Sequence, residues 1–372
     1  MKAVIINKED LRYNIEKIKE IVSQDLPDDN GNNVKIIAVV KSNGYGIGIV
    51  EYTKFLIDNG IDYFAVATIE EALKLRQAGI KEKILMLSST SIKEDIKTLI
   101  QNDIILTIGS VESAEIADSL GKELNKKISC HIKIDSGFGR YGFVYSNMNE
   151  VVVTLKNLEN LKIEGTFTHF SNAYYDDNYT KKQFDRFIDC IEVLKKNKID
   201  TGLLHACNTS AFIKFKYMHL NAVRVGSAFT GRISFENNIG FKKIGYLKSN
   251  VSEIKTLPKG FNIGYSNTYT TKKETKVAIV PAGYMDGFNI QVGKDMLRFV
   301  DKVRYLLNDF KSLFKKQKIY VNINGQKCPV LGRIGTYHMT VDITGKNVKI
   351  NDEVILSNTI KHVDSSVRRE WI

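Results

Sequence analysis

The feature that most constrains this fold is a regular alternation of short apolar runs with helical stretches over roughly the first 240 residues. Eight runs read as strands, at 36–40, 63–67, 84–87, 104–108, 128–134, 163–168, 203–206 and 222–225. Stretches with helical patterning, such as 49–57, 69–77, 111–124 and 181–195, lie between them. Alternation of this kind favours parallel βαβ units, and eight of them predict a closed (β/α)8 barrel. An open doubly wound sheet is the alternative.

After about residue 240 the pattern changes to short strands separated by Gly, Asn and Asp turns. These strands are expected at 246–254, 276–280, 319–323, 330–332, 340–343 and 353–356. An amphipathic helical segment at 295–314 interrupts them and reads as an insertion. The expected organisation is an N-terminal strand within 1–10 that joins the β-domain, a barrel at 11–240, and a mainly β domain at 241–372.

Composition and charge argue against several classes of protein. The 372 residues are 43% hydrophobic and 26% charged, as in a globular chain. The apolar runs are shorter than the ~20 residues of a membrane helix, and early charges at Lys2, Lys8 and Glu9 argue against a secretory signal. The net charge of +12 is spread along the chain, which favours a basic surface over a nucleic-acid groove. We expect neither a membrane nor a nucleic-acid partner.

The four cysteines, Cys130, Cys190, Cys207 and Cys328, are far apart and form no CxxC pair. This spacing argues against a structural zinc site and against a disulfide framework. It fits a reducing compartment, so we expect a cytoplasmic protein without a metal.

In a barrel, reactive groups follow the C-terminal ends of the strands. The residues in such places are Lys41, Asp135, Arg140, His169, Asn208, Thr209, Ser210, Gly226 and Ser227. If Lys41 is partly desolvated at the barrel mouth, its pKa is lowered and it can form a Schiff base. The alternative is that Lys41 is an ordinary surface lysine at the end of a strand. Gly226 and Ser227 occupy the usual phosphate position of barrels. A lysine and a phosphate site at one mouth suit pyridoxal phosphate.

Seven segments in order resemble motifs of the alanine racemase family. They are 38–46 (AVVKSNGYG), 131–142 (HIKIDSGFGRYG), 168–170 (THF), 205–210 (HACNTS), 223–226 (VRVG), 264–270 (GYSNTYT) and 283–287 (GYMDG). The resemblance covers most of the chain. It implies racemisation of a small amino acid with pyridoxal phosphate, most readily alanine and then serine, and a head-to-tail homodimer. D-alanine made in this way would supply bacterial peptidoglycan.

The resemblance also implies roles for individual residues. Lys41 would bind the cofactor covalently and act as one acid/base, and Tyr265 of the partner subunit would be the other. Cofactor contacts would come from Tyr45, His169, Asn208, Thr209, Arg224, Gly226 and Ser227, with Arg224 at the pyridine nitrogen. Substrate contacts would come from Arg140, Tyr284 and Thr336. Lys133 would be a candidate for carbamylation.

These residue types suit the chemistry. Racemisation removes a proton from one face of the α-carbon and returns one to the other face, so it needs two bases. Lysine and tyrosine have free pKa values of about 10, which burial and neighbouring charges can change. Arginine donates a hydrogen bond to the pyridine nitrogen without giving up its proton, which disfavours transamination.

The sequence departs from the family pattern at three places. Thr336-Tyr337 stands where the family has a Met-Asp pair, Ser365 stands where it has a tyrosine, and 295–314 is inserted. We therefore expect a remodelled substrate entrance and an altered side-chain specificity.

Other interpretations remain open at this point. A barrel-type decarboxylase shares the lysine but would typically place an acidic residue where Arg224 stands. A non-enzymatic carrier of the cofactor would need no Tyr265. Without the motif, Tyr265 in its aromatic strand would be interpreted as core packing, His205 as a structural histidine and Asp286 as a turn residue.

Overall fold

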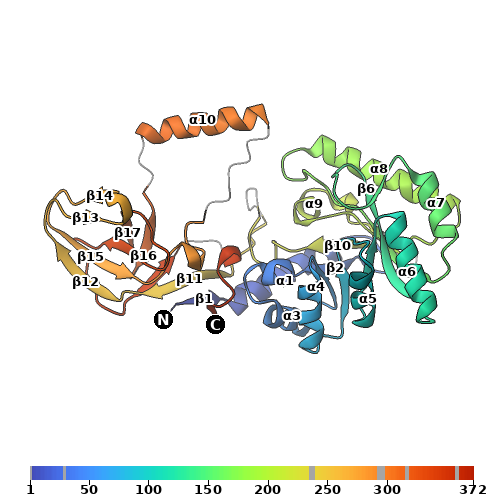
Figure 1. Cartoon of the computed structure of the whole chain (residues 1–372), viewed down its shortest axis with the longest axis horizontal. Coiled ribbons are helices and arrows are strands. Elements are labelled where there is room, and N and C mark those ends of the chain that lie inside the picture. Colours follow the sequence, from blue (N-terminus) through green and yellow to red (C-terminus); the bar gives the residue numbers. More distant parts are fainter. Residues whose placement is uncertain (1, 28–30, 234–238, 291–297, 315–317, 357–359) are drawn as a thin grey trace. The chain divides into compact units, whose positions relative to one another are not determined.

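The computed structural model describes residues 2–27, 31–233, 239–290, 298–314, 318–356 and 360–372. The chain divides into two compact units. The barrel unit is Lys8–Ile244, and the β unit combines Met1–Asn7 with Gly245–Ile372. Figure 1 follows the chain from the blue N-terminal strand through the barrel unit to the yellow and red strands of the β unit.

Eight parallel strands form the sheet of the barrel unit in the described residues. Along the sheet they are β4 (Lys83–Met86), β3 (Tyr63–Val66), β2 (Lys35–Val39), β10 (Ala222–Val225), β9 (Leu203–His205), β8 (Leu161–Phe167), β6 (Ile128–Asp135) and β5 (Leu106–Ile108). A bridge between Leu85 and Ile105 joins the two ends of this order, where the Met86 amide donates to the Ile105 carbonyl at 3.0 Å. The sheet is thus a nearly closed barrel, which confirms the predicted fold class over the open sheet.

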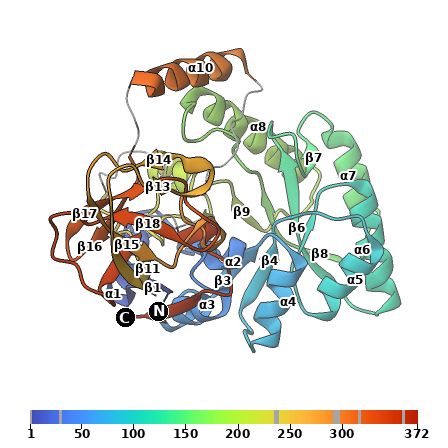
Figure 2. The same cartoon turned by 60° about the vertical axis from the view of Figure 1, so that its left-hand side comes forward.

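Helices connect the strands and lie outside the barrel sheet (Figure 2). They are α1 (Lys8–Ser23), α3 (Ile49–Asp58), α4 (Ile69–Gln77), α5 (Lys93–Gln101), α6 (Val111–Glu123), α7 (Met148–Lys156), α8 (Asp177–Lys196) and α9 (Thr209–Lys214), with the short turn α2 (Lys41–Tyr45), the 3-10 turn η1 (Lys216–Met218) and the two-residue strand β7 (Phe143–Val144). Side-chain caps fix several starts, since Thr68, Ser110 and Asp176 each accept a backbone N–H three residues on. Each cap fixes where the chain turns from strand into helix.

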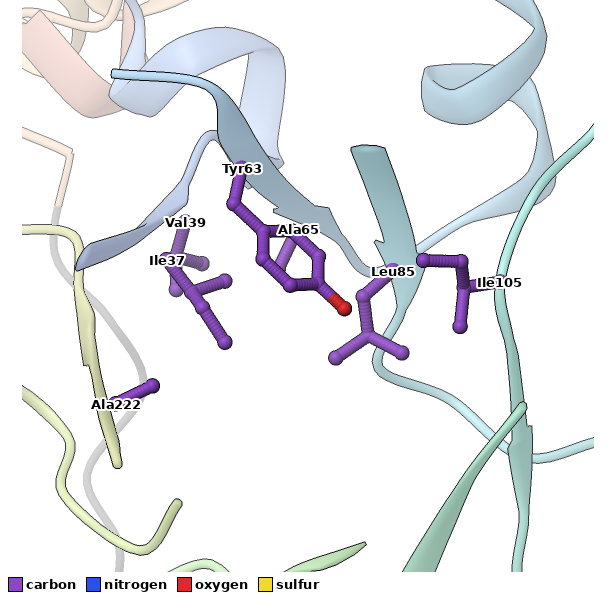
Figure 3. Close-up of a cluster of buried hydrophobic side chains, with 7 residues drawn as sticks. All are labelled: Ile37, Val39, Tyr63, Ala65, Leu85, Ile105 and Ala222. Atoms are coloured by element: carbon purple, nitrogen blue, oxygen red, sulfur yellow. The ribbon is translucent and has the colours of Figure 1, made fainter. Parts of the chain in front are cut away.

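An apolar cluster fills part of the barrel (Figure 3). It consists of Ile37, Val39, Tyr63, Ala65, Leu85, Ile105 and Ala222. Residues two apart on β2 and on β3 belong to it because side chains of a strand alternate between the two faces of the sheet. Tyr63 brings a hydroxyl group into this cluster, and a buried hydroxyl needs a hydrogen-bond partner.

The β unit is built on a second sheet. Its strands, in spatial order, are β12 (Glu253–Leu257), β15 (Thr275–Val280), β18 (Met339–Asp342), β17 (Gln326–Leu331), β16 (Tyr320–Ile323), β19 (Glu353–Leu356), β11 (Gly245–Asn250), β1 (Ala3–Ile6) and β20 (Arg368–Trp371). The hairpin β13 (Asn262–Ile263) with β14 (Tyr269–Thr270) and the 3-10 turns η2 (Tyr265–Asn267), η3 (Tyr284–Asp286) and η4 (Ile360–His362) complete it. Strand β1 pairs antiparallel with β11 and parallel with β20.

Two predicted elements differ in detail. The expected strand at 246–254 is two strands, because β11 pairs with β19 whereas β12 pairs with β15, and the chain changes neighbours at Val251 and Ser252. The expected helix at 295–314 is α10, Phe299–Phe314, and residues 295–297 lie outside the described residues. Among the described helices, none has the length and apolar character needed to cross a bilayer.

Candidate active site

A cavity of about 200 Å³ lies at the C-terminal ends of the barrel strands. It is lined by Val39, Lys41, Tyr45, Leu87, His169, Asn208, Thr209, Ser210, Arg224, Gly226 and Ser227. Eight of these are the predicted cofactor residues Lys41, Tyr45, His169, Asn208, Thr209, Arg224, Gly226 and Ser227. The structure therefore brings that set together around one space.

The turn α2 presents Lys41 and Tyr45 to this cavity. Ser42, Asn43, Gly44 and Tyr45 all have φ between 51° and 62°, a left-handed conformation that is costly for residues other than glycine. Polar contacts stabilise it, since the Asn43 amide donates to Glu71 Oε1 at 3.2 Å and Asn43 Oδ1 accepts the Ile49 amide at 3.1 Å. The left-handed turn thus begins directly after Lys41.

Tyr45 packs so closely on Gly226 that any side chain there would have to move the phenol. A Cβ added at Gly226 would lie 2.2 Å from the Tyr45 hydroxyl oxygen. The Gly226 amide donates to Thr209 Oγ1 at 3.2 Å. Burial, with the nearby Glu71 charge, raises the pKa of Tyr45 to about 12, so its phenol stays protonated at neutral pH.

Arg224 is a buried cation held by neutral acceptors. Its Nη2 donates to the carbonyls of Thr168 at 2.6 Å and Ala206 at 3.0 Å, and lies 3.4 Å from His169 Nδ1. Its Nη1 donates to the His205 carbonyl at 3.0 Å and to His205 Nδ1 at 2.7 Å. Burial lowers the pKa of Arg224 to about 10, and the guanidinium remains charged at neutral pH.

Lys133 lies within β6, near its C-terminal end, and Arg140 lies in the loop that follows this strand. Burial, followed by repulsion from Arg224, lowers the pKa of Lys133 to about 7, and its Nζ lies 4.7 Å from the ring centre of Phe167. Asp135 accepts four backbone N–H groups, those of residues 137–140, which shapes the loop that carries Arg140. Arg140 is exposed and does not line the cavity.

The other predicted residues lie in the β unit. Tyr265 is 71% exposed in the turn η2, so its interpretation as a core residue in a strand is wrong. The reason is local, because left-handed φ values of 80° at Gly264 and 58° at Ser266 break the strand around it. Tyr265 and Thr336 line a second cavity of about 710 Å³, and the Tyr284 hydroxyl lies 2.9 Å from Thr336 Oγ1.

Asp286 is a structural residue. It is buried, accepts the Gly283 amide at 2.9 Å and pairs with Lys2 at 2.6 Å. The sequence did not point to Leu87 and Val39 as cavity residues. Their place in apolar strand ends carries no chemical signal, although the barrel rule could have selected them. Within the described ranges, no three His, Cys, Asp or Glu side chains are grouped as metal ligands.

The fold and the cavity define a barrel protein with an amine, a guanidinium and several hydroxyl donors at the barrel mouth. The alanine racemase N-terminal domain matches residues 6–233, and the C-terminal domain matches residues 244–369. The chain belongs to the alanine racemase family, and it is an isomerase. This confirms the resemblance found in the motifs.

Individual relatives agree with this assignment. Alanine racemase 1 of Caldanaerobacter subterraneus is 32% identical over 96% of this chain and 85% of its own length. Alanine racemase of Methanococcus maripaludis is 34% identical over 92% of this chain and 85% of its own length. A solved structure of alanine racemase from Clostridium difficile has a TM-score of 0.86 at 29% identity, covering 100% of this chain and 95% of that one.

Proposed function

We propose that this protein interconverts L- and D-alanine with pyridoxal phosphate bound at the barrel cavity. The curated relatives named above are alanine racemases. The observation that carries the proposal is the cavity itself, which combines the Lys41 amine, the Arg224 guanidinium and the hydroxyls of Tyr45, Thr209 and Ser227. Serine is the second candidate substrate, because Thr336-Tyr337 replaces the usual family pair.

The donor set fits the cofactor. Tyr45, Thr209 and Ser227 offer neutral hydroxyl donors suited to a phosphate, and Asn208 and Gly226 border them. The tight contact of Tyr45 with Gly226 holds the phenol at that place. Lys41 would bind the cofactor covalently, and His169 would lie beside its ring. When bound, pyridoxal phosphate withdraws electrons from the α-carbon of the attached amino acid and so acidifies the α-proton.

Arg224 would face the ring nitrogen. It keeps its own proton at neutral pH, so it offers a hydrogen bond without protonating that nitrogen. An arginine at the ring nitrogen favours return of a proton to the α-carbon over transamination. It also argues against the decarboxylase alternative, which would typically use an acidic residue there.

Lys41 and Tyr265 would be the two bases. We propose that Tyr265 of the partner subunit completes the site in a homodimer. The exposure of Tyr265 supports this role, because a base contributed across an interface must be accessible in the single chain. A carrier protein would need no second base, and so the same residue argues against that alternative.

Lys133 is the candidate for carbamylation. A lysine with a pKa of about 7 has a large neutral fraction at pH 7, and a neutral amine can add to carbon dioxide with release of a proton. The resulting anion would interact with the Arg140 guanidinium, whose charge already acts on Lys133. We propose Arg140, Tyr284 and Thr336 as the substrate contacts.

The destination of the product follows from its chemistry. We propose that the protein works in the cytoplasm and supplies D-alanine to peptidoglycan synthesis.

The test is proton NMR of L-alanine and of L-serine in heavy water with the cofactor-loaded protein, followed by chiral analysis. Loss of the α-proton signal together with growth of the D-isomer is the expected result with alanine. Lys41→Ala should abolish both, whereas Tyr265→Phe should slow inversion by about 10³-fold or more if Tyr265 is a base. Release of carbon dioxide, or no exchange with either amino acid, would overturn the proposal.

A further inference from the structure

A row of hydrogen bonds leads from the cavity into the barrel interior. Arg224 Nη1 lies 2.7 Å from His205 Nδ1, and His205 Nε2 lies 2.7 Å from His131 Nδ1. His131 Nε2 lies 2.8 Å from the Tyr63 hydroxyl. All four side chains are buried. The row connects the cavity to the tyrosine of the apolar cluster in Figure 3.

The chemistry of Arg224 fixes the direction of this row. A guanidinium only donates, so His205 Nδ1 must be unprotonated and must accept. A neutral His205 then carries its proton on Nε2 and donates to His131 Nδ1. His131 in turn carries its proton on Nε2 and donates to the Tyr63 hydroxyl oxygen, which is the terminal acceptor.

Both histidines are neutral, as this direction requires. Burial lowers the pKa of His131 to about 3, with Lys83 and Arg224 adding repulsion. Burial and the charge of Arg224 lower the pKa of His205 well below its ordinary value. With both rings neutral, each has one donor and one acceptor, and the row has a single consistent arrangement.

The backbone is shaped around His131. The pairing of β6 with β8 shifts register there, since Cys130 pairs with Ile163 but His131 pairs with Gly165. A Cβ at Gly165 would lie 2.5 Å from His131 Cε1, so only glycine leaves room for the ring. A β-bulge changes the direction of a side chain, and this bulge sets the direction of His131. Phe167 stacks on His205 with ring centres 4.8 Å apart and nearly parallel planes.

We propose that Tyr63 and His131 are positioning residues for Arg224. Their hydrogen bonds keep the unprotonated nitrogen of His205 turned toward the guanidinium. The reverse direction, with Tyr63 as donor, would place an N–H of His205 against an N–H of Arg224 and push the guanidinium from its place. The proposal rests on the proposed function in one respect, which is that Arg224 faces the cofactor ring.

The structural part is tested without cofactor. Nitrogen-15 NMR of histidine-labelled protein at pH 7 should show His131 and His205 as neutral rings protonated on Nε2. Tyr63→Phe removes the terminal acceptor, so the His131 signals should shift and the melting temperature should fall. The matched control is Tyr52→Phe, because among the described residues the buried Tyr52 hydroxyl has no hydrogen-bond partner. It should leave the signals of both histidines unchanged.

The functional part uses the cofactor-loaded enzyme. Tyr63→Phe should lower kcat roughly fivefold, as expected for one buried hydrogen bond, with little change in KM, and should shift the absorbance of the bound cofactor. Tyr52→Phe should change neither kcat nor the absorbance of the cofactor. A His205 ring protonated on Nδ1, or a Tyr63→Phe variant with unchanged histidine signals and absorbance, would overturn the proposal. A wild-type protein without racemase activity would refute the proposed function but not the NMR result.

Discussion

Gly226 shows at the scale of one residue how the cavity depends on close packing. Its backbone is not in the left-handed region, so alanine is allowed by φ, but the added Cβ would lie 2.2 Å from the Tyr45 hydroxyl. We expect Gly226→Ala to weaken pyridoxal phosphate binding about tenfold, since overpacking moves the phenol. A fluorescence titration measures the dissociation constant.

The matched comparison is the double variant with Tyr45→Phe, which lacks the hydroxyl that the Cβ would meet. The two losses should combine to less than their product, because both act on one contact. Fully multiplicative losses would show that the Gly226 substitution acts elsewhere.

Lys133 gives a pH dependence with a defined sign. Its pKa falls from 10.5 in the unfolded chain to about 7 in the folded protein, so the unfolded chain binds more protons between pH 7 and 10.5. The free energy of unfolding should therefore rise with pH across that window, and the penalty is complete below pH 7. Lys133→Met should remove this rise. Denaturant titrations in buffer free of carbon dioxide measure it, and equal slopes for both proteins would contradict the assignment.

Residue positions were predictable where a side chain follows a strand, as with Lys41 and His169, because the barrel rule places strand ends at one mouth. Tyr265 was not placed correctly by its own sequence context. Its aromatic neighbours suggested a strand, and the left-handed turn around Ser266 is invisible to apolar periodicity. His131 lies in one of the seven motif segments, but the sequence assigned it no role, because its partners come from β3 and β9, which are distant in sequence.

The apolar side chains of α10 that the structure describes, from Phe299 to Phe310, are exposed. Leu306 is 69% exposed, whereas Leu247 on β11 is fully buried. Leu247→Ala should lower the free energy of unfolding by about 2–5 kcal/mol, and Leu306→Ala should change it by less than about 0.5 kcal/mol. Denaturant titrations of both variants compare them directly. A large loss for Leu306→Ala would mean that this face of α10 is covered in solution.

The eight strand–helix units were readable from the sequence because buried parallel strands are continuous apolar runs with helices between them. Boundaries were less accurate where pairing partners decide them. The separation of β11 from β12 depends on β19 and β15, which the sequence of that segment does not contain. The extra residue Glu164 at the β8 bulge is likewise a property of pairing with β6.

At the scale of the whole molecule, the N-terminal strand belongs to the unit formed by the end of the chain. Strand β1 is fully buried between β11 and β20, with Val4 facing Leu247 and Arg369 in register. An apolar strand before the barrel suggested this placement, but only long-range pairing specifies its neighbours. The β unit therefore cannot complete its sheet from residues 245–372 alone.

A rearranged chain tests this dependence. Ile6 pairs with Gly245 in antiparallel register, so joining Asn7 to Gly245 through one added glycine creates the turn Asn-Gly between the paired residues. Asn-Gly is the preferred two-residue hairpin turn, and it matches the twist of the strands. We expect residues 1–7 joined in this way to 245–372 to fold, with dispersed amide signals and a cooperative melt. The same piece without β1 should not, because its unpaired strand edges expose backbone donors and apolar side chains. Equal folding of both pieces would show that β1 adds little to the β unit.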